Sequence, residues 1–212
     1  MKCLICNSLT EHFIDKKEDI DYFECKSCQF TMKSNNYFVD FSKQKQRYDL
    51  HENSENNIGY RDYFNRFLNF ILEDIQKPKT ALDFGCGATA LLSKILKEKN
   101  IQCDFYDPIY YPKNNYNNKY DLILSIEVFE HLHNPKETFK SLVEKINPNG
   151  YLAIQTAFYP QNRDKFLKWY YRLDPTHIIF FSPNTFKILA DNHGLDIIKS
   201  NNKEMILMKK RG

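Results

Sequence analysis

The sequence predicts an α/β fold, a mainly parallel sheet that carries a small N-terminal module, and three observations support this prediction. Strand and helix patterns alternate from residue 79 to the end, which is typical of a parallel sheet. A glycine-rich turn, Asp83-Phe-Gly85-Cys-Gly87, stands between one such strand and helix. Two closely spaced cysteine pairs come before it. We therefore expect a module at residues 1–40, a linker and packing helix at 41–78, and the main domain at 79–212.

Length and composition narrow the class of protein. The chain has 212 residues and a formal net charge of +3, which fits one α/β domain with an appendage. Its lysines are spread along the sequence, so a nucleic-acid partner is permitted but not indicated. There is no apolar run of about 18 residues, the length that a membrane span needs. The first residues lack the apolar core of a signal peptide, and we expect a cytoplasmic location with reduced thiols.

The N-terminal module contains Cys3-x2-Cys6 and Cys25-x2-Cys28, which enclose a stretch of eighteen residues. This spacing is that of a four-cysteine zinc site, in which two knuckles present thiolates to a tetrahedral ion. Forty residues bury too little surface to be stable alone, so a structural zinc explains the module better than four unrelated free thiols do. Short strands at 11–14 and 21–24 would form a ribbon.

The rest of the chain follows a clear order of elements. Residues 42–57 are polar without a period and indicate a linker or flap. Apolar residues recur at helical spacing over 59–72, so a packed helix follows, and Pro78 ends it. Strands are then expected at 80–84, 101–106, 120–125, 151–156, 195–199 and 205–209, with helices at 88–99, 135–145 and 183–193.

The turn at residues 83–89 has the features of a cofactor site. Glycine at 85 and 87 allows the backbone to approach a ligand closely, and the following helix directs free N–H groups at it. Asp107 lies at the end of the next strand, where a carboxylate can bind both hydroxyls of a ribose. A glycine turn alone is weak evidence, but the strand before it, the helix after it and the acid about twenty residues on strengthen it.

These residues resemble class I S-adenosylmethionine-dependent methyltransferases over residues 58–212. The resemblance rests on Leu82-Asp-Phe-Gly-Cys-Gly87, on Tyr106-Asp107-Pro, on the segment from Tyr120 to Leu132 and on Asn147-Pro-Asn-Gly-Tyr-Leu-Ala-Ile-Gln-Thr156. It implies S-adenosylmethionine as the cofactor and a Rossmann-like sheet. The cofactor contacts that it implies are Asp83, Gly85, Gly87 and Asp107.

One departure from the family is large. Between Asp107 and Tyr120, family members usually have a helix and a third strand, but only residues 108–119 remain here. Twelve residues span at most roughly 40 Å, which is enough to cross two strand spacings of about 5 Å each without a helix. We therefore expect a reduced sheet of six strands that lacks the third.

The segment Glu127-Val-Phe-Glu130-His131 follows the fourth strand of the family pattern. In a helical turn, Glu127 would share one face with Glu130 and His131. This Glu-x-x-Glu-His segment resembles the one in quinone-biosynthesis O-methyltransferases and in small-RNA 2′-O-methyltransferases. The resemblance to the RNA enzymes implies that His177 could supply a fourth metal ligand. Three readings stay open: the four residues hold a second divalent metal, His131 or His177 acts as a general base, or Glu130 and His131 brace the loop.

The sequence thus predicts an S-adenosylmethionine-dependent methyltransferase with a structural zinc and no membrane span. Its acceptor is a small molecule or RNA, and the acid-rich centre leans towards O-methylation, because a hydroxyl needs help to lose its proton. The alternative is a non-catalytic cofactor-binding adaptor whose ribbon binds RNA or protein.

Overall fold

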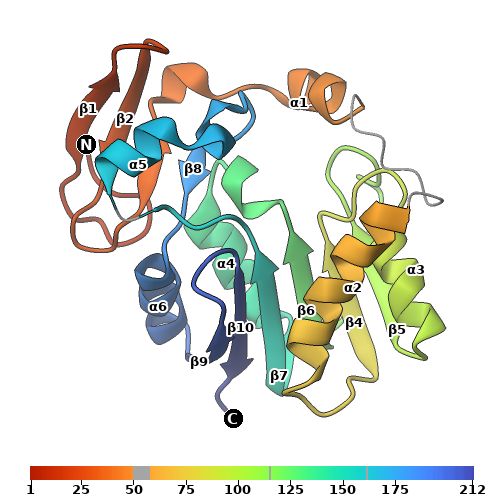
Figure 1. Ribbon diagram of the computed structural model, residues 1–212. Coiled ribbons are helices and arrows are strands. Elements are labelled where there is room, and N and C mark those ends of the chain that lie inside the picture. The colour runs from red at the N-terminus through yellow and green to blue at the C-terminus, as the bar shows by residue number, and fades with distance from the viewer. Residues whose placement is uncertain (50–57, 115, 161) are drawn as a thin grey trace.

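The computed structural model describes residues 1–49, 58–114, 116–160 and 162–212, so positions 50–57 of the expected linker lie outside the described residues. Two sheets lie side by side (Figure 1), one of six strands in the order β5-β4-β6-β7-β10-β9 and one of four strands in the order β1-β2-β3-β8. The strands are β1 (Glu11–Asp15), β2 (Ile20–Glu24), β3 (Thr31–Lys33), β4 (Thr80–Phe84), β5 (Gln102–Tyr106), β6 (Tyr120–Ile126), β7 (Ile146–Gln155), β8 (Ile179–Phe180), β9 (Leu195–Ser200) and β10 (Met205–Lys210). The α-helices are α1 (Phe41–Tyr48), α2 (Ile58–Leu72), α3 (Leu91–Glu98), α4 (Pro135–Glu144), α5 (Arg163–Lys168) and α6 (Pro183–Asn192), and the 3₁₀ helices are η1 (Asn35–Tyr37), η2 (Phe129–His131) and η3 (Tyr170–Leu173).

The six-stranded sheet is parallel on one side and antiparallel at its other edge. Strands β5, β4, β6 and β7 are paired in parallel, while β10 runs antiparallel to both β7 and β9. The predicted fold class is confirmed, including the reduction to six strands. Among the described residues of 108–119 there is no strand, and the chain crosses directly from β5 to β6 on the far side of β4.

Helices cover both faces of this sheet. Helices α2 and α3 pack on one face, where Phe67, Leu68 and Leu96 are fully buried against the strands. Helices α4 and α6 pack on the other face, as Figure 1 shows. Because water is excluded from both faces, the central strand β6 is apolar almost without alternation. No helix among the described residues is long and apolar enough to cross a bilayer.

The ribbon is joined to the rest of the molecule by backbone pairing. Its third strand, β3, pairs antiparallel with β8, in the register Thr31 to Phe180. Ribbon residues Ile5 and Phe30 belong to the same buried cluster as the residues of α6, and the Phe30 and Phe181 rings lie 5.4 Å apart. The ribbon therefore shares a hydrophobic core with the larger domain.

Helix α1 lies within the stretch that has no apolar period in the sequence. Asp40 begins it, because its side chain accepts a hydrogen bond from the Lys43 backbone N–H at 2.9 Å. Gln44 is the one buried residue among 42–48, and it is polar. A helix with a polar buried side leaves no periodic pattern to detect, which explains why this helix was not expected. In Figure 1, α1 lies above the sheet, at the end where the arrows of β6 and β7 point.

Candidate active site

A cleft of about 390 Å³ lies at the carboxyl ends of the parallel strands, where ligands bind in open α/β sheets. Its walls come from α1, α2, the glycine turn, the residues after β5 and the turn after β6. All four predicted cofactor residues line it, as do three of the four residues proposed for the reaction centre: Asp83, Gly85, Gly87, Asp107, Glu127, His131 and His177.

The glycine turn depends on backbone conformations that side chains would disturb. Gly85 and Gly87 have φ of +79° and +63°, in the left-handed region that favours glycine. The turn is held by the N–H of Gly85, which donates to the carbonyl of Tyr106 at 2.8 Å. A Cβ on Gly85 would lie 2.2 Å from Cγ2 of Val128, whereas a Cβ on Gly87 would meet nothing within 4 Å. Gly85 therefore closes the turn against Val128, and Gly87 faces open space.

Gly85→Ala is expected to destabilise the protein by more than about 2 kcal/mol, because the new methyl adds a clash to the left-handed strain of about 1–2 kcal/mol. The measurement is the free energy of unfolding in denaturant. Gly194→Ala is the matched control, since Gly194 has φ of +72° but nothing within 4 Å of a Cβ, so that it tests strain alone. Equal losses in the two variants would contradict the role given to the contact between Gly85 and Val128.

Asp107 is fixed by three backbone groups. Its Oδ1 accepts from the N–H groups of Ile109 and Tyr110 at 2.8 and 3.1 Å, and its Oδ2 accepts from the N–H of Gly87 at 3.0 Å. A carboxylate has about four lone-pair sites, so one remains to accept a ligand hydroxyl. The carboxylate thus links the glycine turn to the end of β5 and is rigid before any ligand binds.

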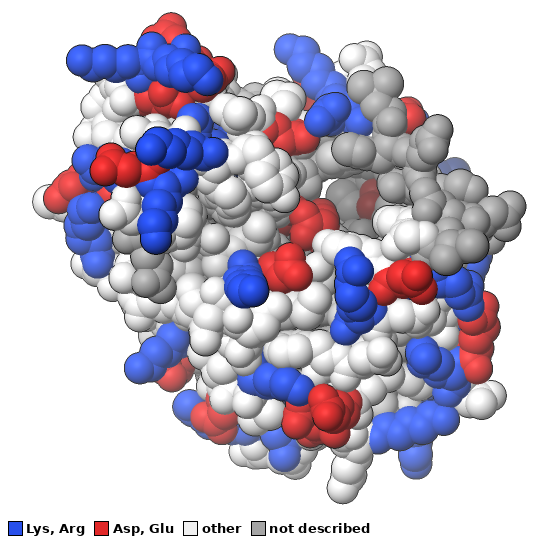
Figure 2. Space-filling view, in the orientation of Figure 1, with Lys and Arg blue, Asp and Glu red and all other residues white. Residues whose placement is uncertain are grey.

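The cleft is acidic. Asp83, Asp107, Glu127 and Asp174 line it, and no Lys or Arg is found among its described lining residues. Acidic side chains are visible inside the hollow in Figure 2. Oδ2 of Asp83 is buried and has no hydrogen-bond partner, and burial, with the nearby charge of Asp107, raises the pKa of Asp83 to about 7. Such a site suits a cationic ligand, and it would repel the pyrophosphate of a dinucleotide.

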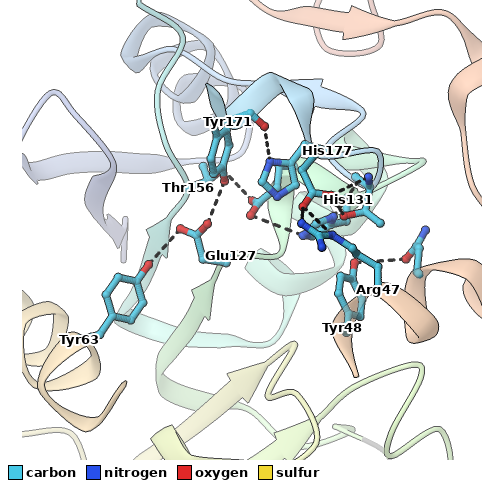
Figure 3. Close-up of polar contacts among 12 residues, drawn as sticks. Arg47, Tyr48, Tyr63, Glu127, His131, Thr156, Tyr171 and His177 are labelled. Atoms are coloured by element: carbon cyan, nitrogen blue, oxygen red, sulfur yellow. Dashed lines mark hydrogen bonds and ion pairs between the residues drawn. The ribbon is translucent and has the colours of Figure 1, made fainter. Parts of the chain in front are cut away.

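Glu127 lines the cleft at the turn after β6. Its backbone has φ of +53°, and its carboxyl accepts hydrogen bonds from the hydroxyls of Tyr63 and Tyr171, each at 3.1 Å (Figure 3). Tyr63 in turn accepts from Nε2 of Gln155 at 2.7 Å. Burial, together with the neighbouring Glu130, raises the pKa of Glu127 to about 8.

Glu130, His131 and His177 form a cluster in which one potential ligand atom of each residue lies within 4.8 Å of the others. The Glu130 carboxyl is fully buried. Its Oε2 accepts from the Thr156 hydroxyl at 2.8 Å, its Oε1 has no hydrogen-bond partner, and Nε2 of His131 is 3.6 Å from Oε1. The cluster therefore offers an unused carboxylate oxygen next to two imidazoles.

Backbone carbonyls set the orientation of both imidazoles. Nδ1 of His131 lies 2.8 Å from the carbonyl of Thr176, and Nδ1 of His177 lies 2.7 Å from the carbonyl of Tyr171. A carbonyl only accepts, so each Nδ1 carries the proton and each Nε2 keeps its lone pair. Burial lowers the pKa of both rings, and at His177, which also neighbours His131, it brings the pKa to about 3.

The cluster differs from a helical face. Helix η2 begins at Phe129, after Glu127, so Glu127 lies beside the cluster and binds Tyr63 and Tyr171. Side chains from helix α1 also lie at the cluster. Arg47 forms an ion pair with Asp174 at 3.0 Å, and the centroid of the Tyr48 ring lies 5.3 Å from that of the His131 ring. The apolar period of α2 had indicated a core role for Tyr63, and only the fold shows its hydroxyl at Glu127.

The four cysteines of the ribbon also form a cluster, with one potential ligand atom of each within 4.8 Å of the others. The Sγ atoms of Cys3 and Cys28 are 3.5 Å apart, and so are those of Cys6 and Cys25. Thiolates around a tetrahedral zinc lie roughly 3.8 Å apart, given Zn–S bonds of about 2.3 Å. The donor set and its spacing therefore fit a zinc ion.

Two comparisons with known proteins agree with this geometry. Residues 56–200 match a family described as a methyltransferase domain. No curated protein sequence matches significantly. Among solved structures, human N-acetylserotonin methyltransferase in complex with S-adenosylmethionine is similar, with a TM-score of 0.56 and 14% identity over 82% of this chain and 57% of that chain.

Two further structures are similar to this chain. The N-methyltransferase NodS from Bradyrhizobium japonicum, in complex with S-adenosylhomocysteine, has a TM-score of 0.53 and 14% identity over 82% of this chain and 99% of that chain. The mitomycin 7-O-methyltransferase MmcR has a TM-score of 0.56 and 12% identity over 81% of this chain and 61% of that chain. At such identities the likeness shows the fold alone, and the chain spans little more than half the length of the human enzyme.

Proposed function

Since this chain belongs to a family of methyltransferase domains, we propose that it transfers a methyl group from S-adenosylmethionine to a hydroxyl oxygen of its acceptor. The observation that carries the choice of oxygen is the buried cluster of Glu130, His131 and His177 at the cleft. Folds of this kind serve N- and O-methyltransferases alike, so the choice rests on the residues of the site.

The cleft has the groups that the cofactor needs. S-adenosylmethionine supplies, when bound, an electrophilic methyl group on a sulfonium. Asp107 is held where its carboxylate can accept a hydrogen bond from a ribose hydroxyl. The open backbone at Gly87 leaves room for the methionine end, and the acidic lining, above all the unpartnered Oδ2 of Asp83, offsets positive charge.

Oxygen acceptors are the class that requires the cluster. A hydroxyl is a poor nucleophile until its proton is removed or its pKa is lowered, whereas an amine can use its free lone pair. The lone pairs on Nε2 of His131 and His177, together with the Glu130 carboxylate, can hold a divalent cation, which would lower the pKa of a bound hydroxyl. Metal-ligating histidines usually donate their other N–H to a carbonyl or carboxylate, as both do here.

The metal part of this proposal is tested by titrating Co²⁺ into protein whose ribbon is already loaded with zinc. We expect one further Co²⁺ to bind, with an absorption spectrum typical of nitrogen and oxygen ligands, and its binding to be lost in His177→Ala. Leu173→Ala, at an exposed neighbour, is the control and should bind Co²⁺ as the wild type does. A wild-type protein that binds no second ion would exclude the metal and leave a general base or a bracing role for these residues.

The acceptor is tested with labelled S-adenosylmethionine and separate pools of small molecules and RNA. We expect label to enter one pool through an ether or 2′-O-methyl linkage, which resists the base that releases methyl esters. Label found only on nitrogen or sulfur would contradict the assignment to oxygen while leaving the methyltransferase activity in place.

Binding of the cofactor is expected to release a proton near pH 7. The pKa of Asp83, raised to about 7 mainly by burial, means that about half of the free protein holds a proton there at pH 7, and a cationic ligand favours the ionised form. Affinity should therefore rise between pH 6 and 8. The folding stability of the free protein depends on pH in the opposite direction to the affinity. The contribution of Asp83 to stability is complete below its pKa in the unfolded chain, near 4, and is lost as pH rises through 7.

Calorimetry in two buffers with different ionisation enthalpies measures the proton. The apparent binding enthalpy should differ between the buffers for the wild type, and the difference should shrink in Asp83→Asn, which has no proton to release. The same buffer dependence in both proteins would show that another group, such as Glu127, is the source.

A further inference from the structure

The ribbon and the reaction centre are joined through a single turn of backbone. The N–H of Lys33, at the end of β3, donates to the carbonyl of Ile178 at 2.8 Å, and the N–H of Ile178 donates to the carbonyl of Glu130 at 2.9 Å. Ile178 directly follows His177. Strand β3 is thus hydrogen-bonded to Ile178, which follows His177 in the chain and hydrogen-bonds Glu130.

The side chain of Lys33 extends this connection. Lys33 is 2% exposed, and its ammonium donates to the backbone carbonyl of Asp174 at 2.9 Å. The N–H of His177 donates to the same carbonyl at 3.2 Å. A ribbon side chain therefore fixes Asp174, the first residue of the turn that leads to His177.

That turn also controls His131. Oδ1 of Asp174 accepts from the backbone N–H and the hydroxyl of Thr176 at 2.9 and 2.6 Å, and the carbonyl of Thr176 fixes Nδ1 of His131. A shift of Asp174 would move the Thr176 carbonyl and with it the imidazole. One lysine of the ribbon thus acts on both histidines through the turn at residues 174–177.

A second buried charge connects the same two regions. Arg172 and Asp15 of β1 form an ion pair at 2.6 Å, with side chains that are 3% and 6% exposed. Arg172 follows Tyr171, whose carbonyl holds Nδ1 of His177. Each carbonyl that orients an imidazole therefore lies within two residues of a residue that a buried charged side chain of the ribbon contacts: Asp174, held by Lys33, and Arg172, paired with Asp15.

Buried cations are a costly way to join two domains. Removing an ammonium from water carries a penalty of several kcal/mol, and apolar contacts such as that of Phe30 with Phe181 already join the two domains. Burial lowers the pKa of Lys33 to about 8, a sign of that penalty. An apolar side chain would give adhesion without the penalty, but it could not hold a carbonyl in place.

We propose that Lys33 is a positioning residue of the reaction centre, so that the zinc ribbon fixes the geometry of His131 and His177. The catalytic meaning of this proposal rests on the proposed function, while the geometry can be tested without it. If Lys33 is removed, the imidazoles should lose their fixed orientation, and the glycine turn on the other side of the cleft should keep its affinity for the cofactor.

The test compares Lys33→Met with Lys17→Met, whose side chain is 86% exposed. Nitrogen-15 spectra of the histidine rings, assigned with His131→Gln and His177→Gln, report the position of the ring proton directly. In Lys33→Met we expect the Nδ1–H signals of His131 and His177 to shift or disappear, and Co²⁺ affinity at the centre to fall about tenfold or more. Zinc content and the affinity for S-adenosylhomocysteine should remain within about twofold of the wild type.

Wild-type histidine signals together with wild-type Co²⁺ affinity in Lys33→Met would overturn the proposal. If this variant does not fold, Lys33→Gln, which keeps a polar but shorter side chain, is measured in the same way and judged by the same signals. Failure of the wild type to bind S-adenosylhomocysteine would instead contradict the proposed function, because the histidine spectra do not depend on cofactor or acceptor.

Discussion

Asp107→Ala is expected to weaken the binding of S-adenosylmethionine by about tenfold or more. A hydrogen bond to a charged group contributes about 1.5–3 kcal/mol, so a ribose hydroxyl bound at the remaining lone-pair site of Asp107 accounts for about 10- to 150-fold in Kd. The variant also removes the acceptor for the N–H groups of Gly87, Ile109 and Tyr110. The glycine turn would therefore lose one of its connections to the end of β5, while the hydrogen bond from the Gly85 N–H to the Tyr106 carbonyl would remain.

Calorimetric titration with S-adenosylmethionine and S-adenosylhomocysteine measures this loss. Asp104→Ala is a suitable control, since Asp104 belongs to the same strand but hydrogen-bonds Tyr120 at 2.8 Å and does not line the cleft. The control should bind the cofactor as the wild type does. If Asp107→Ala kept an affinity within about threefold of the wild type (less than about 0.7 kcal/mol), ribose recognition by this carboxylate would be excluded.

Cys25→Ala is expected to lower the melting temperature by about 10 °C or more. Structural zinc contributes folding free energy of about 10 kcal/mol or more in small modules, and a loss of even 4 kcal/mol lowers the melting temperature of a domain this size by about 8–16 °C. Cys25 is completely buried, and three thiols cannot complete a tetrahedral shell. Because Ile5 and Phe30 share a core with α6, the loss should reach the larger domain.

The measurement is thermal unfolding combined with metal analysis. Cys103→Ala is the matched control, because Cys103 is also buried but stands outside the cluster, and its loss should lower the melting temperature by only a few degrees, as is usual for about 1 kcal/mol. The control should bind one more zinc ion per chain than Cys25→Ala does. Similar melting temperatures for both variants, or a wild type without zinc, would contradict a structural metal.

The parts of the fold that sequence could predict are those with a local signal. The apolar strands, the glycine turn and the cysteine pairs each occupy a few neighbouring residues, and the short span of 108–119 was enough to predict a missing strand. Helix α1 gave no such signal, because its buried Gln44 is polar. Strand β8 has two residues and pairs with β3 far away in the sequence, so only tertiary structure reveals it.

The site divides in the same way. The place of Gly85, Gly87 and Asp107 in one cleft was predictable, because they follow strand ends whose common edge is fixed by the topology. The surroundings of Glu130, His131 and His177 come from separate segments: Tyr63 reads as a core residue of its helix, and Lys33 as one of many lysines of the ribbon. Their polar atoms become informative only when the fold places them at Glu127 and Asp174.

The most direct test is a crystal structure of the protein with S-adenosylhomocysteine. The account predicts the ribose hydroxyls at Asp107, the amino acid end at the turn from Gly85 to Gly87, and the sulfur facing the cluster of Glu130, His131 and His177. An empty cleft at saturating ligand, or the same cleft filled by a different ligand that displaces S-adenosylhomocysteine, would contradict it.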